Sequence, residues 1–146
     1  PKVADALKPS GAFALLWNMN LEPAADLWER LKTAFQVHAP NLSRYEGLER
    51  QAEILIELGQ MMVQSARFEP PCIESICCKH SYHIDDYITL LSTYSYYIKL
   101  PEIQRSKLFE DLRTTITQWE NHSRIQLFNR CGFQLSYKCG ATPELS

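Results

Sequence analysis

The sequence LKPSGAFALLWN at residues 7–18 predicts the end of a helix, a tight turn and one buried strand. Pro9 fixes its own φ and disfavours helical geometry in the residue before it, so the preceding helix should stop there. Ser10 and Gly11 suit a turn, because glycine adopts positive φ without steric cost. Residues 12–17 are apolar without interruption, which is typical of a strand covered on both faces in a parallel α/β sheet. A buried helical segment is the alternative, and the Pro-Ser-Gly turn argues against it.

The end of this strand is where we expect a ligand. In open parallel sheets, ligands bind outside the carboxyl ends of the strands. Trp17 and Asn18 occupy that end, and we predict that both contact the substrate. For Asn18, a structural role as the cap of the following loop fits the sequence equally well.

The same stretch resembles the "LKPGG, strand, WN" segment of class I S-adenosylmethionine-dependent methyltransferases, which leads into the fifth strand of that family's sheet. Ser10 stands where the family usually has the first of two glycines. Residues 65–71 (SARFEPP) and 85–95 (DDYITLLSTYS) resemble the later part of a subgroup with a helical insertion near the substrate. The resemblance covers nearly the whole chain, but only the C-terminal portion of the family pattern.

The resemblance implies an α/β fold for residues 1–146. It would be the C-terminal part of a Rossmann-like methyltransferase sheet, with about three strands in mixed orientation and large helical insertions at residues 19–71 and 84–122. The implied cofactor is S-adenosylmethionine, bound by a larger parent enzyme that methylates a small-molecule acceptor. The sequence lacks a GxGxG turn after a strand, a P-loop and an acidic residue placed to bind a ribose. These absences agree with a chain that contains only the C-terminal part of the family's fold. We therefore expect the N-terminal cofactor-binding half to lie outside this chain, and the chain alone to be inactive.

Composition narrows the range of partners and compartments. The 146 residues suffice for one domain with its own core. A net charge of -2 and a pI near 6.1 give no reason to expect nucleic acid or a membrane surface as a partner. No apolar run approaches the roughly 20 residues of a spanning helix, and no signal peptide is visible. Five cysteines without a CxxC pair favour reduced thiols and a cytoplasmic location.

Helical spacing of apolar residues predicts three long helices. The first starts at Pro23 and ends before Pro40, and the second follows a capping box at residues 43–46 and ends before residues 70–71 (PP). The third carries its apolar stripe on residues 108–119. A shorter helix should begin at Asp85 and Asp86, with His83 as its cap, because negative charge is favourable at a helix N-terminus.

Three further segments predict strands in the second half of the chain. Residues 72–82 are rich in β-branched and small residues with roughly alternating polarity. Residues 125–128 and 133–138 follow, and the alternation in the latter indicates an antiparallel strand. We expect residues 141–146 to be a disordered tail.

A cluster of metal-binding residue types falls on the first of these strands and contains Cys72, Cys77, Cys78, His80 and His83. Zinc requires about four converging ligands. On an extended strand only Cys78 and His80 share a face, so we expect no metal site. A nucleophilic cysteine would need a lowered thiol pKa, and an inert thiol is the commoner case even beside basic residues.

Tyrosines gather in residues 82–97, where the chain has five of them. Tyr87, Leu91 and Tyr94 share one helical face, which is explained either by core packing or by a pocket for the acceptor. The resemblance favours the pocket, because this insertion tends to cover the methyl acceptor in the family. The predicted substrate-binding residues are therefore Trp17, Asn18, Tyr87, Leu91 and Tyr94. The sequence identifies neither a catalytic residue nor the acceptor atom.

The sequence leaves one alternative function open and predicts how the isolated chain behaves. A non-catalytic helical binding or interaction module is the alternative function, and it requires no cofactor. Residues 12–17 are too apolar to face water on both sides, so the chain by itself is expected to self-associate or to be unstable.

Overall fold

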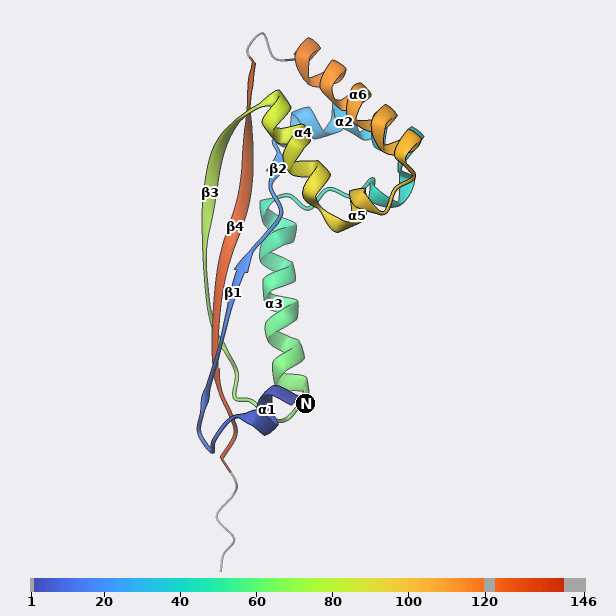
Figure 1. The fold of residues 1–146 in the computed structure, drawn as a ribbon. Helices are drawn as coiled ribbons and strands as arrows, with labels where there is room; N and C mark the ends of the chain where they lie inside the picture. Colours follow the sequence, from blue (N-terminus) through green and yellow to red (C-terminus); the bar gives the residue numbers. More distant parts are fainter. Residues whose placement is uncertain (1, 120–122, 141–146) are drawn as a thin grey trace, which may run out of the picture. The chain divides into compact units, whose positions relative to one another are not determined.

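The computed structural model describes residues 2–119 and 123–140 and has a mixed α/β fold (Figure 1). The elements in chain order are α1 (Lys2–Ala6), β1 (Ala12–Asn18), β2 (Glu22–Pro23), α2 (Ala25–His38), the 3-10 helix η1 (Pro40–Leu42), α3 (Leu48–Gln64), β3 (Cys72–His83), α4 (Ile84–Thr93), α5 (Ser95–Ile98), α6 (Glu102–Trp119) and β4 (Arg124–Tyr137). They divide into two compact units. Within the described residues, unit 1 contains residues 2–20, 48–78 and 129–140, and unit 2 contains residues 21–47, 79–119 and 123–128.

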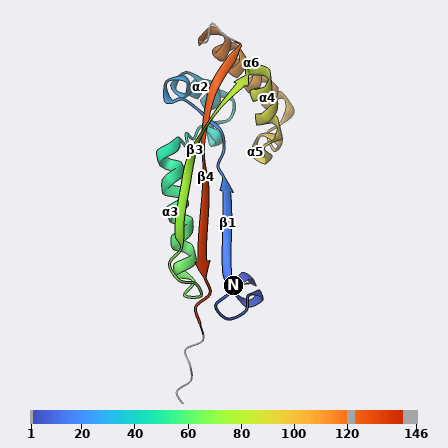
Figure 2. The same cartoon turned by 90° about the vertical axis from the view of Figure 1, so that its left-hand side faces the viewer.

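The sheet of unit 1 is centred on β4, which pairs with both β1 and β3 (Figure 2). β1 runs antiparallel to β4, in a register from Ala12 opposite Tyr137 to Asn18 opposite Cys131. The predicted strand is therefore confirmed. The predicted mixed orientation is not found, because the sheet in the described residues is antiparallel and has four strands.

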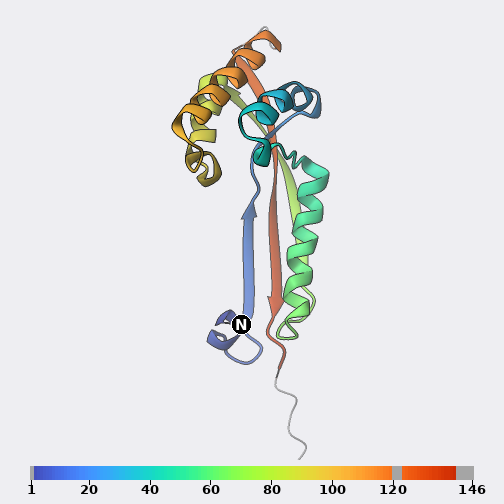
Figure 3. The ribbon, with the colours of Figure 1, turned by 90° about the vertical axis from the view of Figure 1, so that its right-hand side faces the viewer.

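The expectation that both faces of β1 are buried is wrong for the described residues. Exposed and half-buried residues alternate along the strand, and Leu16 is 83% exposed. In unit 1, α3 lies along one face of the sheet (Figure 3). Phe13 and Leu15 pack on a small core that includes Met62 of α3. The other face carries the exposed residues.

Close approach of α3 to the sheet depends on two glycines. A Cβ on Gly132 of β4 would lie 2.7 Å from Leu55, and a Cβ on Gly59 of α3 would lie 2.7 Å from Ile73. The buried Gln134 side chain donates a hydrogen bond to the Leu55 carbonyl. Helix and sheet are therefore joined by both packing and a polar anchor.

The turn before β1 forms as predicted, with the strained residue in a different place. Ser10 adopts φ 57°, and Gly11 has no positive φ. Gly11 donates a backbone hydrogen bond to Lys8 over 2.9 Å, and a Cβ on Gly11 would meet the same carbonyl oxygen at 2.9 Å. Glycine is thus required at residue 11 for space, while the left-handed conformation falls on Ser10.

Unit 2 is a helical layer on a short sheet segment. β2 pairs antiparallel with residues 127–128 of β4. The helix α2 packs against α6, and α4 packs against α5 and α6. Fully buried residues of this core are Leu31, Leu108, Leu112, Ile116, Ile125 and Leu127. The helix predicted to end before Pro40 is confirmed as α2, although it starts at Ala25 because Pro23 belongs to β2. The helix with its apolar stripe on residues 108–119 is confirmed as α6.

Several local expectations require correction. The capping box at residues 43–46 does not open α3, because that helix starts at Leu48 and Ser43 closes η1. The two C-terminal strands are one continuous strand, β4. His83 is the N-terminal neighbour of α4, without a side-chain capping bond. The predicted insertion at 19–71 also contains β2, and the predicted tail at 141–146 lies outside the described residues.

Candidate functional site

Trp17 is the first of the predicted ligand contacts, and a hydrogen bond holds its side chain in place. Its indole Nε1 donates a hydrogen bond to Oε1 of Gln134 over 3.3 Å. Because Gln134 also bonds the Leu55 carbonyl, this amide links Trp17 to α3. Contact of Trp17 with a ligand remains a prediction.

Asn18 is exposed at the end of β1, and its amide oxygen accepts two hydrogen bonds. Oδ1 of Asn18 accepts a hydrogen bond from Nδ2 of Asn129 over 2.6 Å and one from the Cys131 thiol over 3.3 Å. Nδ2 of Asn129 also donates to the Met19 carbonyl over 3.0 Å. These contacts orient the Asn18 side chain and secure the loop that follows.

Tyr87 and Leu91 lie in the core of unit 2. Each is 3% exposed, and both belong to the cluster built around α2 and α6. Burial raises the pKa of the Tyr87 hydroxyl well above its ordinary value. The placement is that of core side chains.

Tyr94 has a different environment, because it is half-buried beside two other tyrosines. Its ring centroid lies 5.5 Å from that of Tyr96 and 6.4 Å from that of Tyr97. Burial raises the pKa of the Tyr94 hydroxyl, while a backbone hydrogen bond with Leu21 acts in the opposite direction. The predicted helical face shared by Tyr87, Leu91 and Tyr94 is not found, because α4 ends at Thr93 and Tyr94 follows in an extended conformation. Of these three residues, Tyr94 is the one whose side chain is partly accessible.

Glu22 of unit 2 is a further candidate site residue, which the sequence alone did not indicate. It lies in β2, opposite Phe128 of β4. Burial, and then the nearby charge of Glu46, raise the pKa of the Glu22 carboxyl to about 8, while a hydrogen bond with the Glu46 backbone lowers it. Burial, and to a smaller extent the charge of Glu22, raise the pKa values of Tyr94, Tyr96 and Tyr97, so the carboxyl interacts electrostatically with all three hydroxyls. We call these four residues the Glu22–tyrosine cluster.

The only hint of Glu22 in the sequence is a single acidic residue between Leu21 and Pro23. A lone carboxylate just before a proline is unremarkable in a sequence. Its environment depends on residues far along the chain, including its strand partner Phe128 and the nearby Glu46. No local pattern signals such a contact.

A cavity in unit 2 adjoins this cluster through Tyr96. Its volume is about 380 Å³, within the range that small-molecule sites occupy. His38 lines the cavity, and its Nε2 lies 2.7 Å from Oδ2 of Asp111. The other lining residues are Ala39, Pro40, Asn41, Leu42, Lys99, Leu100 and Gln104.

The five predicted site residues fall into two groups. Trp17 and Asn18 belong to unit 1, whereas Tyr87, Leu91 and Tyr94 belong to unit 2. Within unit 2 the structure brings Tyr94 together with Glu22, Tyr96 and Tyr97.

The described residues do not fit S-adenosylmethionine. A nucleotide-type cofactor is usually held where a strand leads through a glycine-rich turn into a helix. Gly11 precedes β1, Gly59 lies inside α3 and Gly132 lies inside β4, so none of them forms such a turn. We therefore derive no step that involves this cofactor from these residues.

Two further observations concern metal sites and membrane-spanning helices. Within residues 2–119 and 123–140, no group of three or more histidine, cysteine or acidic side chains is positioned to hold a metal ion. None of the described helices combines the length and apolar character needed to span a membrane.

No protein-family model matches the chain, and no curated protein matches it. The functional interpretation therefore rests on the residues and their geometry.

Proposed function

We propose that this chain is the acceptor-side part of a larger S-adenosylmethionine-dependent methyltransferase that methylates a small molecule. The observation that carries the proposal is the LKPSG turn leading into β1 and ending at Trp17 and Asn18. In the methyltransferases that this stretch resembles, glycine stands at the position of Ser10. The positive φ of Ser10 gives that glycine a physical reason, because the left-handed region costs other residues about 1–2 kcal/mol.

The position of β1 in the sheet also supports a larger parent protein. β1 stands at one end of the strand order, so only one of its two edges is paired within the described residues. Its exposed face includes Leu16. An apolar strand with an unpaired edge is a surface to which further strands or helices add.

The Glu22–tyrosine cluster supplies chemistry for the acceptor. Methylation of a hydroxyl or amine releases a proton, and a general base works best when its pKa lies near the operating pH. A carboxyl with a pKa of about 8 meets that condition. Tyr94 and Tyr96 would contribute aromatic walls and hydroxyls that orient a small molecule.

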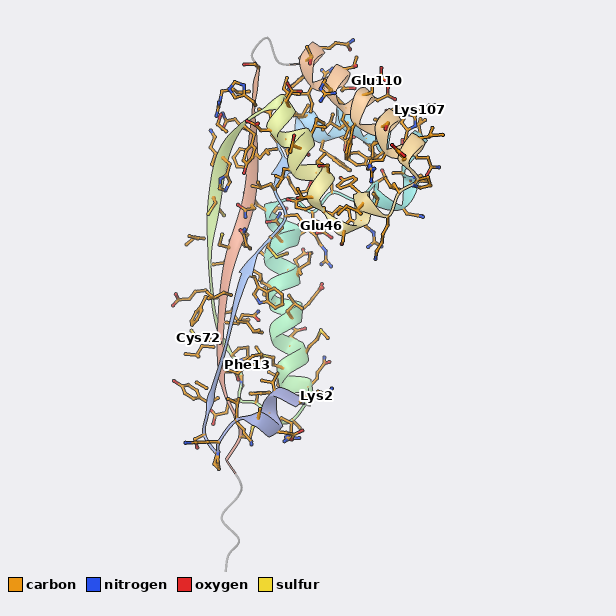
Figure 4. All side chains as sticks on the ribbon, in the orientation of Figure 1. Lys2, Phe13, Glu46, Cys72, Lys107 and Glu110 are labelled. Carbon is orange, nitrogen blue, oxygen red and sulfur yellow. The ribbon has the colours of Figure 1, made fainter. Side chains whose placement is uncertain are left out.

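The test uses the natural gene product that contains these residues. We expect it to transfer a labelled methyl group from S-adenosylmethionine to a fraction of small molecules, whereas the 146-residue chain alone shows no saturable binding of the cofactor in calorimetry. Glu22→Gln should lower turnover by about 100-fold and leave the affinity for S-adenosylhomocysteine unchanged. Glu110, exposed on α6, is the matched control as Glu110→Gln (Figure 4). A gene product that neither binds S-adenosylhomocysteine nor transfers methyl groups would overturn the proposal.

A non-catalytic binding module is the second candidate function. It is favoured by the absence of a cofactor-binding turn in residues 2–119 and 123–140, together with the cavity beside Tyr96. A module of this kind would bind small molecules with equal affinity with and without S-adenosylmethionine, and Glu22→Gln would alter binding without any turnover to lose.

A further inference from the structure

Two cysteines of unit 1 lie side by side on neighbouring strands. Cys78 belongs to β3 and Cys131 to β4, and their Sγ atoms are 3.7 Å apart. Both are half-buried, whereas Cys72, Cys77 and Cys139 are exposed. A disulfide has an S–S length of about 2.05 Å, so the two sulfurs need to approach by less than about 2 Å to bond.

The pair continues a row of side chains across three strands. Asn18 of β1 stands opposite Cys131 in the register of the sheet, and the Cys131 thiol donates to Oδ1 of Asn18 over 3.3 Å. Cys78 approaches Cys131 from the other side of β4. Because successive side chains of a strand point to opposite faces, the adjacent Cys77 faces away from this row.

The Cys131 thiol interacts with several neighbours. Burial raises the pKa of the Cys131 thiol, and so do the hydrogen bond and the charge of Cys78. A hydrogen bond from Asn129 acts in the opposite direction. Attack on an oxidant by either thiol leads to the same disulfide, because the second thiol then resolves the mixed disulfide.

We propose that Cys78 and Cys131 form an intramolecular disulfide when the reduced protein meets a low-molecular-weight disulfide such as oxidised glutathione. The Cys78 thiolate attacks one sulfur of the oxidant, and the first glutathione leaves as a thiolate. Cys131 loses its proton to solvent and attacks the Cys78 sulfur of this mixed disulfide, which releases the second glutathione. Two protein thiols are oxidised to one disulfide, and one oxidised glutathione is reduced to two thiols.

The bond would also act on Asn18. Oxidation removes the thiol donor to Oδ1 of Asn18 and joins β3 to β4 covalently. The proposal rests on the geometry of unit 1 alone and is independent of methyl transfer. Its failure would leave the proposed function untouched.

The test oxidises the reduced chain at low protein concentration with increasing oxidised glutathione, blocks free thiols with an alkylating agent and measures the intact mass. We expect the oxidised chain to take up three alkyl groups instead of five, because two thiols have each lost a hydrogen atom to the disulfide, and we expect no retained glutathione on this pair. Because Cys77 and Cys78 are adjacent, the bond is mapped by peptide mass spectrometry in Cys77→Ser, which should oxidise as the wild type does.

Single variants separate this pair from the other cysteines. Cys78→Ser and Cys131→Ser should lose the internal bond and accumulate a glutathione adduct on the remaining partner, while Cys72→Ser and Cys139→Ser should behave as the wild type. Mapping in Cys77→Ser does not depend on how the other variants fold. Only glutathione adducts, a bond between other cysteines, or a bond between two chains in that protein would overturn the proposal.

Discussion

Gly132 of β4 lies directly against Leu55 of α3. A Cβ at residue 132 would come within 2.7 Å of both Cδ atoms of Leu55. Leu55 is buried, and its carbonyl accepts a hydrogen bond from Gln134. The side chain therefore has little room to move away, and this contact determines how closely α3 approaches the sheet.

Gly132→Ala should consequently lower the free energy of unfolding by about 1–3 kcal/mol, the usual cost of overpacking. Urea denaturation followed by circular dichroism measures the loss. Gly140→Ala is the matched control, because a Cβ there meets nothing within 4 Å. If the clash with Leu55 is the cause, Gly132→Ala should cost much less in a Leu55→Ala background. An equal loss in both backgrounds would assign the effect to the backbone.

Ser10→Gly should stabilise the protein by up to about 1 kcal/mol, because glycine relieves the strain of a positive φ. Ser106, exposed within α6, provides a control of opposite sign. Ser106→Gly should destabilise by about 0.5–1 kcal/mol, since glycine is unfavourable inside a helix. Thermal and urea unfolding of both variants measure the two effects. A destabilising Ser10→Gly would mean that the hydroxyl matters more than the backbone strain.

The buried Glu22 carboxyl predicts a stability that falls as pH rises. Its pKa in the folded protein is about 8, above the ordinary 4.5, so folding favours the protonated form. Stability from this group is fully present below pH 4.5 and decreases until the pH has passed about 8. The titratable neighbours coupled to Glu22 are Tyr45, Glu46, Tyr87, Tyr94, Tyr96 and Tyr97.

Glu22→Gln should remove most of this slope, because its amide does not ionise. The gain over wild type should grow from near zero at pH 4.5 to at most about 5 kcal/mol above pH 8. Urea unfolding at a series of pH values measures it, and Glu110→Gln should follow the wild-type curve. Parallel curves for wild type and Glu22→Gln would show that Glu22 is ionised at neutral pH.

Tyr94→Phe and Asn18→Ala test the predicted acceptor contacts and rest on the proposed methyl transfer. Loss of one neutral hydrogen bond to the acceptor costs about 0.5–1.5 kcal/mol, and turnover should fall accordingly while cofactor affinity stays unchanged. Tyr137→Phe, at an exposed residue of β4, is the control. Turnover, cofactor binding and melting temperature are measured on the same variants. Unchanged turnover in both variants would leave packing as the role of these residues.

Leu16→Lys should weaken self-association of the isolated chain. Leu16 is 83% exposed on the apolar strand β1, and a charge there disfavours pairing of strand edges between chains. Sedimentation velocity over a range of concentrations measures the effect. Ile103→Lys is the control, because Ile103 is 71% exposed on α6. A wild-type chain that stays monomeric at high concentration would contradict the prediction.

Several elements were predictable because their signals are local. Pro9 ends α1 by its ring geometry, and the uninterrupted apolar run at residues 12–17 favours a strand. The spacing of Leu108, Leu112 and Ile116 places one face of α6 in the core. In each case the residues that carry the signal lie close together in the sequence.

The tertiary structure alone decided the features that depend on contacts between distant residues. The Cys78 and Cys131 sulfurs meet across 53 positions of sequence, and Nδ2 of Asn129 reaches Asn18 across 111. The pKa of Glu22 depends on its burial and on Glu46, and neither is visible in the Leu-Glu-Pro segment. An apolar strand has the same sequence whether one or both of its faces are covered, so the exposure of Leu16 could not be read from residues 12–17. Periodicity and turn chemistry act over a few residues, and therefore determine the elements of this protein. Burial and the pairing of side chains arise when strands and helices pack, and therefore determine its candidate site.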